Sequence, residues 1–137
     1  MLVLHHAWRS SASRRVRLCI EEKGLAYDGH VVNLDAMEHH SPEYLKINPN
    51  GVIPALIHDG RPLYESGTIC EYLDEVFPDP PLSPDNAYDR ASMRFAGEIF
   101  RQLLHLPASI NWSRLQRHTD TVCFILQRFG RTGERIR

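Results

Sequence analysis

Four prolines fall within residues 78–84, in the run Pro-Asp-Pro-Pro-Leu-Ser-Pro. Proline lacks an amide hydrogen and clashes with the preceding turn of a helix, so no helix continues through such a run. Proline-rich segments act instead as semi-rigid spacers. We therefore expect a first domain over residues 1–78, a linker over residues 79–85 and a second, helical part over residues 86–137.

The part before the linker begins with alternating strand-like and helix-like patterns. Residues 2–6 and 27–34 are short apolar runs of strand character, and the residues between them carry apolar side chains at near-helical spacing until Gly24. This spacing predicts a β-α-β unit, which is long enough for a parallel crossover. A short helical turn is then expected to begin at Ser41, with Pro42 at the first helical position.

Two short strands and a second long helix complete the order. Residues 53–58 and 61–65 flank Asp59 and Gly60, a strong hairpin signal. Apolar positions three and four apart predict a helix over residues 66–76. The order β-α-β, short helix, β-β, α predicts an α/β domain in which a four-stranded mixed sheet carries helices on both faces.

The part after the linker contains one clear helical pattern, over residues 86–106, and a weaker one over residues 121–129. An apolar helix stripe needs partners that bury it, and one further helix offers little cover. The sequence therefore predicts the beginning of an all-α domain, without the rest of it.

Charge, cysteines and histidines narrow the classes of function. A net charge of -1 leaves no broad basic field for nucleic acid or an anionic membrane. No stretch reaches the roughly 18 apolar residues of a membrane helix, and the first residues do not have the arrangement of a signal peptide. We therefore expect a cytoplasmic protein. The cysteines, Cys19, Cys70 and Cys123, form no C-x-x-C motif, and the paired histidines lack zinc-ligand spacing, so we expect no metal.

A run of small hydroxyl side chains stands where the first strand should pass into the first helix, in Trp-Arg-Ser-Ser-Ala-Ser, residues 8–13. Free amides and the positive end of the helix dipole favour an anion there. A serine hydroxyl could donate a hydrogen bond to a bound thiolate and lower the pKa of that thiol below its usual value of about 8.5. The alternative is that Ser10 or Ser11 simply caps the helix.

Pro54 stands where a strand should begin, at the end of the run Asn-Pro-Asn-Gly-Val-Ile-Pro. Because proline has no amide hydrogen to donate to a neighbouring strand, it is expected in an edge strand, at the start of a strand or in a cis turn. A cis bond would turn the backbone of Ile53 outward, where it could pair with a peptide ligand like an added strand. An ordinary trans proline at a loop end is the alternative.

Glu65 and Ser66 precede the second long helix. We expect Ser66 to be the N-cap, so that its hydroxyl and the first free amides form a site for a carboxylate. Glu65 beside it can accept from an ammonium group. Together they would hold both charged groups of an α-amino acid. A plain N-cap is the alternative, and it gives no reason for Glu65.

The three motifs together resemble the glutathione site of the glutathione transferases, over residues 2–106. The run Ser-Ser-x-Ser-x-Arg-Val-Arg, which begins at Ser10, most resembles the zeta class, which includes maleylacetoacetate isomerase. The run Glu-His-His-Ser, residues 38–41, resembles the theta class. The resemblance implies a thioredoxin-like first domain, glutathione as co-substrate and a homodimer.

The resemblance also implies roles for particular residues. Ser10 or Ser11 would hydrogen-bond the glutathione sulfur, with Ser11 favoured in the theta alignment and Ser10 in the zeta alignment. Ile53 would pair through its backbone with the cysteinyl unit, ahead of a cis Pro54.

Three further residues would hold the two ends of glutathione. Glu65 and Ser66 would bind the γ-glutamyl end, and His39 would contact the glycine end, although a solvated loop histidine is an equal alternative. Ala12 departs from the zeta pattern, because zeta enzymes carry a cysteine at that position.

The resemblance implies an enzyme that activates glutathione as a thiolate and conjugates it to a small electrophile, as in detoxification. One alternative is a non-catalytic glutathione-binding or interaction module, suggested by the incomplete helical domain. Another is a zeta-like isomerase, against which Ala12 counts. A thioredoxin or glutaredoxin redox protein would need a cysteine at the start of the first helix, where residues 10–13 supply none.

Overall fold

The computed structural model describes residues 1–104, and side chains over residues 1–98. The chain separates into two compact units, the first ending at Leu82 and the second beginning at Ser83. This division lies within the expected linker, and the domain limits themselves stay a prediction. The helix expected over residues 121–129 lies outside the described residues, as does Cys123.

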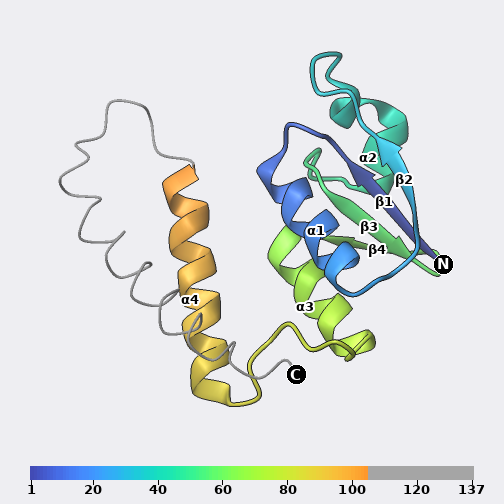
Figure 1. The fold of residues 1–137 in the computed structure, drawn as a ribbon. Coiled ribbons are helices and arrows are strands. Elements are labelled where there is room, and N and C mark those ends of the chain that lie inside the picture. The colour runs from blue at the N-terminus through green and yellow to red at the C-terminus, as the bar shows by residue number, and fades with distance from the viewer. Residues whose placement is uncertain (105–137) are drawn as a thin grey trace. The chain divides into compact units, whose positions relative to one another are not determined.

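One mixed sheet of four strands forms the centre of the first unit (Figure 1). Its strands are β1 (Leu2–His6), β2 (Tyr27–Val31), β3 (Ala55–His58) and β4 (Arg61–Tyr64). Their order is β2-β1-β3-β4; β1 is parallel to β2 and antiparallel to β3, and β3 is antiparallel to β4. The predicted α/β class and four-stranded mixed sheet are confirmed.

The second strand is shorter than the sequence indicated. Val32 makes the last contact with β1, donating its amide to the His6 carbonyl at 2.7 Å. Beyond it, the chain bonds to itself in a turn, where the Met37 amide donates to the Leu34 carbonyl at 3.1 Å. The prediction that this strand continues to Leu34 is therefore wrong.

Two long helices cover one face of the sheet, and a short helix lies on the other face (Figure 1). The long ones are α1 (Ser11–Glu22) and α3 (Ser66–Val76), the short one is α2 (Pro42–Ile47), and a 3-10 turn, η1 (Glu38–His40), precedes α2. Gly24 ends α1, as predicted, because its φ of 61° turns the chain out of the helix. The 3-10 turn was not predicted.

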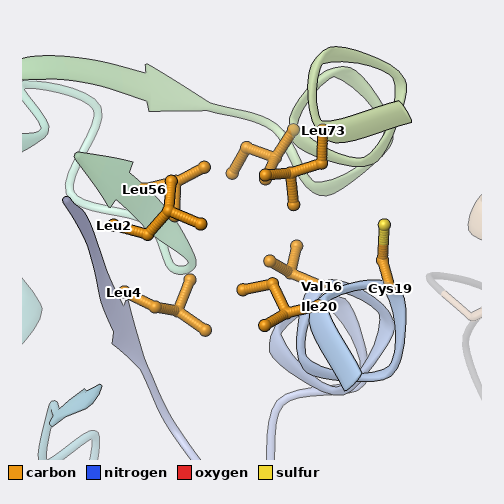
Figure 2. Close-up of a cluster of buried hydrophobic side chains, with 8 residues drawn as sticks. Leu2, Leu4, Val16, Cys19, Ile20, Leu56 and Leu73 are labelled. Atoms are coloured by element: carbon orange, nitrogen blue, oxygen red, sulfur yellow. The ribbon is translucent and has the colours of Figure 1, made fainter. Parts of the chain in front are cut away.

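The hydrophobic core lies between the sheet and the two long helices (Figure 2). Leu2 and Leu4 point the same way because alternate residues of a strand share a face. Val16 and Ile20 meet them from α1, because positions four apart share a face of a helix. The buried cluster consists of Leu2, Leu4, Val16, Cys19, Ile20, Leu56, Ile69 and Leu73.

Polar contacts run along the seam between α1 and α3, and we call them the α1–α3 ladder. Its three rungs are Arg15 Nη1 to Ser66 Oγ at 3.1 Å, Cys19 Sγ to the Cys70 carbonyl oxygen at 3.9 Å, and Lys23 Nζ to Asp74 Oδ1 at 2.6 Å. In both helices each rung lies four residues, about one turn, beyond the previous one. The two helices therefore run parallel to each other along this seam.

The second unit contains α4 (Ala87–Leu104). Asn86 precedes it and accepts a hydrogen bond from the Asp89 amide at 2.8 Å, the contact of an N-cap. The helix expected over residues 86–106 is thus confirmed within the described residues. In the part of the chain that the structure describes, no helix has the length and apolar character needed to cross a membrane.

Candidate functional site

The candidate thiolate site lies where β1 passes into α1. Ser10 is the N-cap, and its hydroxyl oxygen accepts a hydrogen bond from the Ser13 amide at 3.1 Å. Ser11 is the first helical residue and is exposed. A hydroxyl oxygen that accepts from an amide still has its own proton to donate. Capping and thiolate binding are therefore compatible at Ser10, and both serines stay candidates.

The backbone around these serines is held from inside the domain. The Ser10 amide donates to the Ala7 carbonyl at 3.3 Å, and the Ala7 amide donates to Ser13 Oγ at 3.2 Å. Ser13 is fully buried, so its hydroxyl positions the turn and does not face a ligand. Within the described residues, the amides of Ser11 and Ala12 have no acceptor, as is usual in the first turn of a helix. They remain available to an anion.

The peptide bond between Ile53 and Pro54 is cis, and the alternative of a trans proline is wrong. Pro54 is buried and stands directly before β3, while Ile53 is half-buried. Among the described residues, neither the amide nor the carbonyl of Ile53 has a hydrogen-bond partner. The main chain of Ile53 is therefore available to pair with an extended peptide.

Side chains from α2 and its C-terminal end hold the residue before Ile53. The Val52 carbonyl accepts from the Tyr44 hydroxyl at 2.8 Å and from Asn48 Nδ2 at 2.6 Å. Burial raises the pKa of Tyr44 to about 12, so the phenol keeps its proton and donates at neutral pH. Asn48 Oδ1 in turn accepts from the Asn50 amide at 3.1 Å. These bonds position the loop that presents Ile53.

Replacing Asn48 with alanine should therefore lower the free energy of unfolding by about 1 to 3 kcal/mol, because a fully buried amide with two partners is lost. Urea-induced unfolding measures the change. Asn50→Ala is the matched control, since the Asn50 side chain is exposed and its amide, which makes the bond, is retained. Equal losses in the two variants would contradict the role assigned to Asn48.

The third motif differs from its prediction in one respect. Glu65, rather than Ser66, is the N-cap of α3, and the prediction that Ser66 caps this helix is wrong. Ser66 is the first helical residue, and its Oγ accepts from Arg15 of α1 instead. Glu65 is exposed and has a φ of 66° and a ψ of 115°, which residues other than glycine rarely adopt. Residues in such rarely populated backbone conformations cluster at functional sites.

Arg15 is the residue of this site that sequence reasoning missed. Its guanidinium lies 3.1 Å from Ser66 Oγ and brings a positive charge to the N-terminal end of α3. That end already favours an anion through its dipole. The partners are 51 residues apart in the sequence, so only the packing of α1 against α3 brings them together.

His39 lies in η1, and its Nδ1 is buried without a hydrogen-bond partner among the described residues. The ring of its neighbour His40 packs against Gly51, where an added Cβ would lie 2.9 Å from His40 Cδ2. Gly51 also has a φ of 62°, so glycine is required there for two reasons. The 3-10 turn is thereby held against the loop that presents Ile53, and the half-buried His39 stays a candidate for the glycine end.

The sheet brings all of these segments to one edge. His5 of β1 pairs with Ala55 of the antiparallel β3, and Ala55 pairs with Tyr64 of β4. The segments after β1, before β3 and after β4 therefore lie side by side. His6 is also in register with Val31 of the parallel β2, so the chain leading to η1 leaves from the same edge.

This edge offers a set of complementary groups. Serine hydroxyls and free amides can stabilise an anion, an unpaired backbone can hold an extended peptide, and a carboxylate can accept from an ammonium group. A small peptide that carries a thiol and a free α-amino acid end matches this set. Within residues 1–98, no three His, Cys, Asp or Glu side chains gather as metal ligands would.

The fold is that of a thioredoxin-like domain, and the groups at this edge are complementary to a small thiol peptide. Residues 4–81 match the family described as "Glutathione S-transferase, N-terminal domain", and the chain belongs to this family. Members of the family bind glutathione.

Particular relatives agree with this assignment. A maleylacetoacetate isomerase of Pseudomonas aeruginosa is 34% identical over 98% of this chain, and the chain spans 60% of that relative's length. The crystal structure of a glutathione transferase homologue from Sulfitobacter with bound glutathione is 27% identical, with a TM-score of 0.71; the match covers 95% of this chain and 67% of that one.

A zeta-class relative has also been solved. A bacterial maleyl pyruvate isomerase of the zeta class is 34% identical with a TM-score of 0.68, and the match covers 71% of this chain and 46% of that one. The predicted resemblance to the glutathione transferases, including the zeta class, is confirmed. The roles of the individual site residues stay predictions.

Proposed function

We propose that this chain carries the glutathione site of a glutathione-dependent enzyme and stabilises the bound thiol as a thiolate. The observation that carries the proposal is the convergence of the three motifs at one edge of the sheet. Family membership and a relative with bound glutathione support it. Thiolate is the nucleophilic form of a thiol, so its stabilisation prepares attack on an electrophile.

Each part of glutathione has a proposed partner. The sulfur accepts from Ser11 or Ser10, and the cysteinyl backbone pairs with Ile53. The γ-glutamyl ammonium is held by Glu65, and its carboxylate lies at the start of α3 beside Ser66.

The charges around the two ends agree with this orientation. Arg15, which donates to Ser66, adds a positive charge next to the γ-glutamyl carboxylate. His39, which is half-buried in η1, contacts the glycine end. No metal takes part in the proposed chemistry.

For the whole protein, the proposal extends to conjugation of glutathione with a small electrophile. A cytoplasmic, detoxifying homodimer is part of the same proposal, on the strength of family membership. The chain spans 60% of the Pseudomonas relative's length, and the electrophile site and the dimer are proposed for the whole protein.

Titration calorimetry with glutathione tests the proposal. Glu65→Gln should weaken binding about 10-fold to 100-fold, because a hydrogen bond to a charged group contributes about 1.5 to 3 kcal/mol. Glu75→Gln, an exposed position near the end of α3, is the matched control and should bind like the original chain. Absence of binding to the folded chain, or equal binding by both variants, would reject the proposed site.

Isomerisation is the second candidate, favoured by the relative named maleylacetoacetate isomerase that matches nearly the whole chain. In this reaction, glutathione would be regenerated, whereas conjugation consumes it. An assay with maleylacetoacetate that follows both the substrate and free glutathione separates the two. Turnover without loss of glutathione would support the isomerase, and Ala12→Cys should then raise the rate. Binding without turnover in either assay would indicate a non-catalytic module.

A further inference from the structure

The middle rung of the α1–α3 ladder places two cysteines from different helices in contact. Cys19 Sγ lies 3.9 Å from the carbonyl oxygen of Cys70, and Cys70 Sγ lies 3.9 Å from the carbonyl oxygen of Arg15. The two thiols are close enough for a hydrogen bond between them to shift the pKa of each. They are 51 residues apart in the sequence, so the pair is not part of a C-x-x-C motif.

The two thiols differ in their readiness to ionise. The hydrogen bond from Cys70 lowers the pKa of Cys19, and the nearby Lys23 lowers it further, against the effects of burial and of Asp74. The same hydrogen bond and burial raise the pKa of Cys70. Cys19 is therefore the thiol that ionises first, and Cys70 stands beside it as a second thiol.

The ladder also holds the pair in place. One turn before it, Arg15 donates to Ser66, and one turn after it, Lys23 pairs with Asp74. Polar contacts on both sides keep the two helices in register, so the sulfurs cannot drift apart without breaking a neighbouring rung. Cys19 is buried, with 7% of the residue exposed, and Cys70 is half-buried, so the proposed oxidant must be a small molecule.

We propose that Cys19 and Cys70 are a site of reversible oxidation, at which a hydroperoxide converts the two thiols to a disulfide that joins α1 to α3. Neither cysteine has a part in the proposed glutathione chemistry. The site is therefore independent of that function, and it can be tested without an assay of glutathione conjugation.

The reaction with hydrogen peroxide balances in two steps. The Cys19 thiolate attacks a peroxide oxygen, the S–O bond forms, the O–O bond breaks, and the hydroxide that leaves takes up a proton as water. Cys70 then attacks the Cys19 sulfur, the S–S bond forms, and the oxygen leaves as a second water with the Cys70 proton. Two thiols are oxidised and one peroxide is reduced to two waters.

Peptide mapping of the whole chain after treatment with hydrogen peroxide tests the proposal. Without reductant, trypsin should release a linked pair of peptides that contain Cys19 and Cys70, and dithiothreitol should separate them. The link closes a long loop in the unfolded chain, so the oxidised protein should also unfold at a higher urea concentration. Both changes should be reversed by dithiothreitol.

Three variants complete the test. The linked peptides should persist in Cys123→Ser and should be absent from Cys19→Ser and Cys70→Ser. If either serine variant fails to fold, the peptide map of the original chain still decides whether the disulfide forms. Retention of both free thiols, sulfinic acid at Cys19 without a link, or disulfides that involve Cys123 would each overturn the proposal.

Discussion

Replacing Lys23 with methionine is expected to lower the free energy of unfolding by about 3 to 5 kcal/mol, the cost of removing one partner from a buried ion pair. The Lys23 side chain is fully buried, and its ammonium lies 2.6 Å from Asp74 Oδ1. It also donates to the carbonyls of Phe77 at 2.7 Å and Pro80 at 2.8 Å. One cation therefore joins the end of α1 to the end of α3 and to the proline-rich segment.

The size of this effect follows from what the variant leaves behind. Methionine fills a similar volume, so packing changes little, while the Asp74 carboxylate and two carbonyls lose the Lys23 ammonium in a place that water reaches poorly. The carbonyls at the end of a helix also carry the negative end of its dipole, which a cation neutralises.

Urea-induced unfolding of the variant and of Lys46→Met gives the comparison. Lys46 is exposed on α2, so its replacement should change stability by about 0.5 kcal/mol or less. Adding Asp74→Leu to Lys23→Met should restore part of the loss, because the carboxylate that has lost its buried cation is then gone. Restoration should be partial, since Asp74 also accepts from the Leu82 amide at 2.9 Å. Equal losses at Lys23 and Lys46 would show that the buried pair contributes nothing.

The sheet was predictable because its signals are local. Strand character on either side of Asp59 and Gly60 indicated the hairpin, and both residues have the positive φ that such a turn requires. Gly24 marked the end of α1 for the same reason. Once the order of strands was known, the positions of the three motifs at one edge followed from the register of β1, β3 and β4.

Features that depend on packing were not predictable. A lysine is normally an exposed residue, so nothing in the sequence marked Lys23 as the buried link between two helices. Ser66 looked like an N-cap because its residue type favours that position, yet Arg15 from α1 engages its hydroxyl. In each case, the deciding partner comes from a distant part of the chain.

The serine that donates to the glutathione sulfur should have the largest effect on reactivity. Its replacement with alanine is expected to lower the rate of conjugation about 100-fold to 1,000-fold, the usual cost of one hydrogen-bond donor to a developing or stable anion. The loss arises because the bound thiol would titrate closer to its unperturbed pKa, with less thiolate at neutral pH. The rate of the variant should therefore recover as the pH rises, and the ultraviolet absorbance of bound thiolate should follow the same curve.

Stability separates the two candidate serines independently of the rate. Ser10 caps α1, so Ser10→Ala should destabilise the domain by about 0.5 to 2 kcal/mol, whereas the exposed Ser11 has no such role. If Ser11→Ala alone raises the pKa of the bound thiol and leaves stability unchanged, Ser11 is the donor and Ser10 is structural. If Ser10→Ala changes both, one hydroxyl caps the helix through its oxygen and binds sulfur through its proton. Ser92→Ala, on α4, serves as the control, and an unchanged thiol pKa in both single variants and in the double variant would remove the serines from the mechanism.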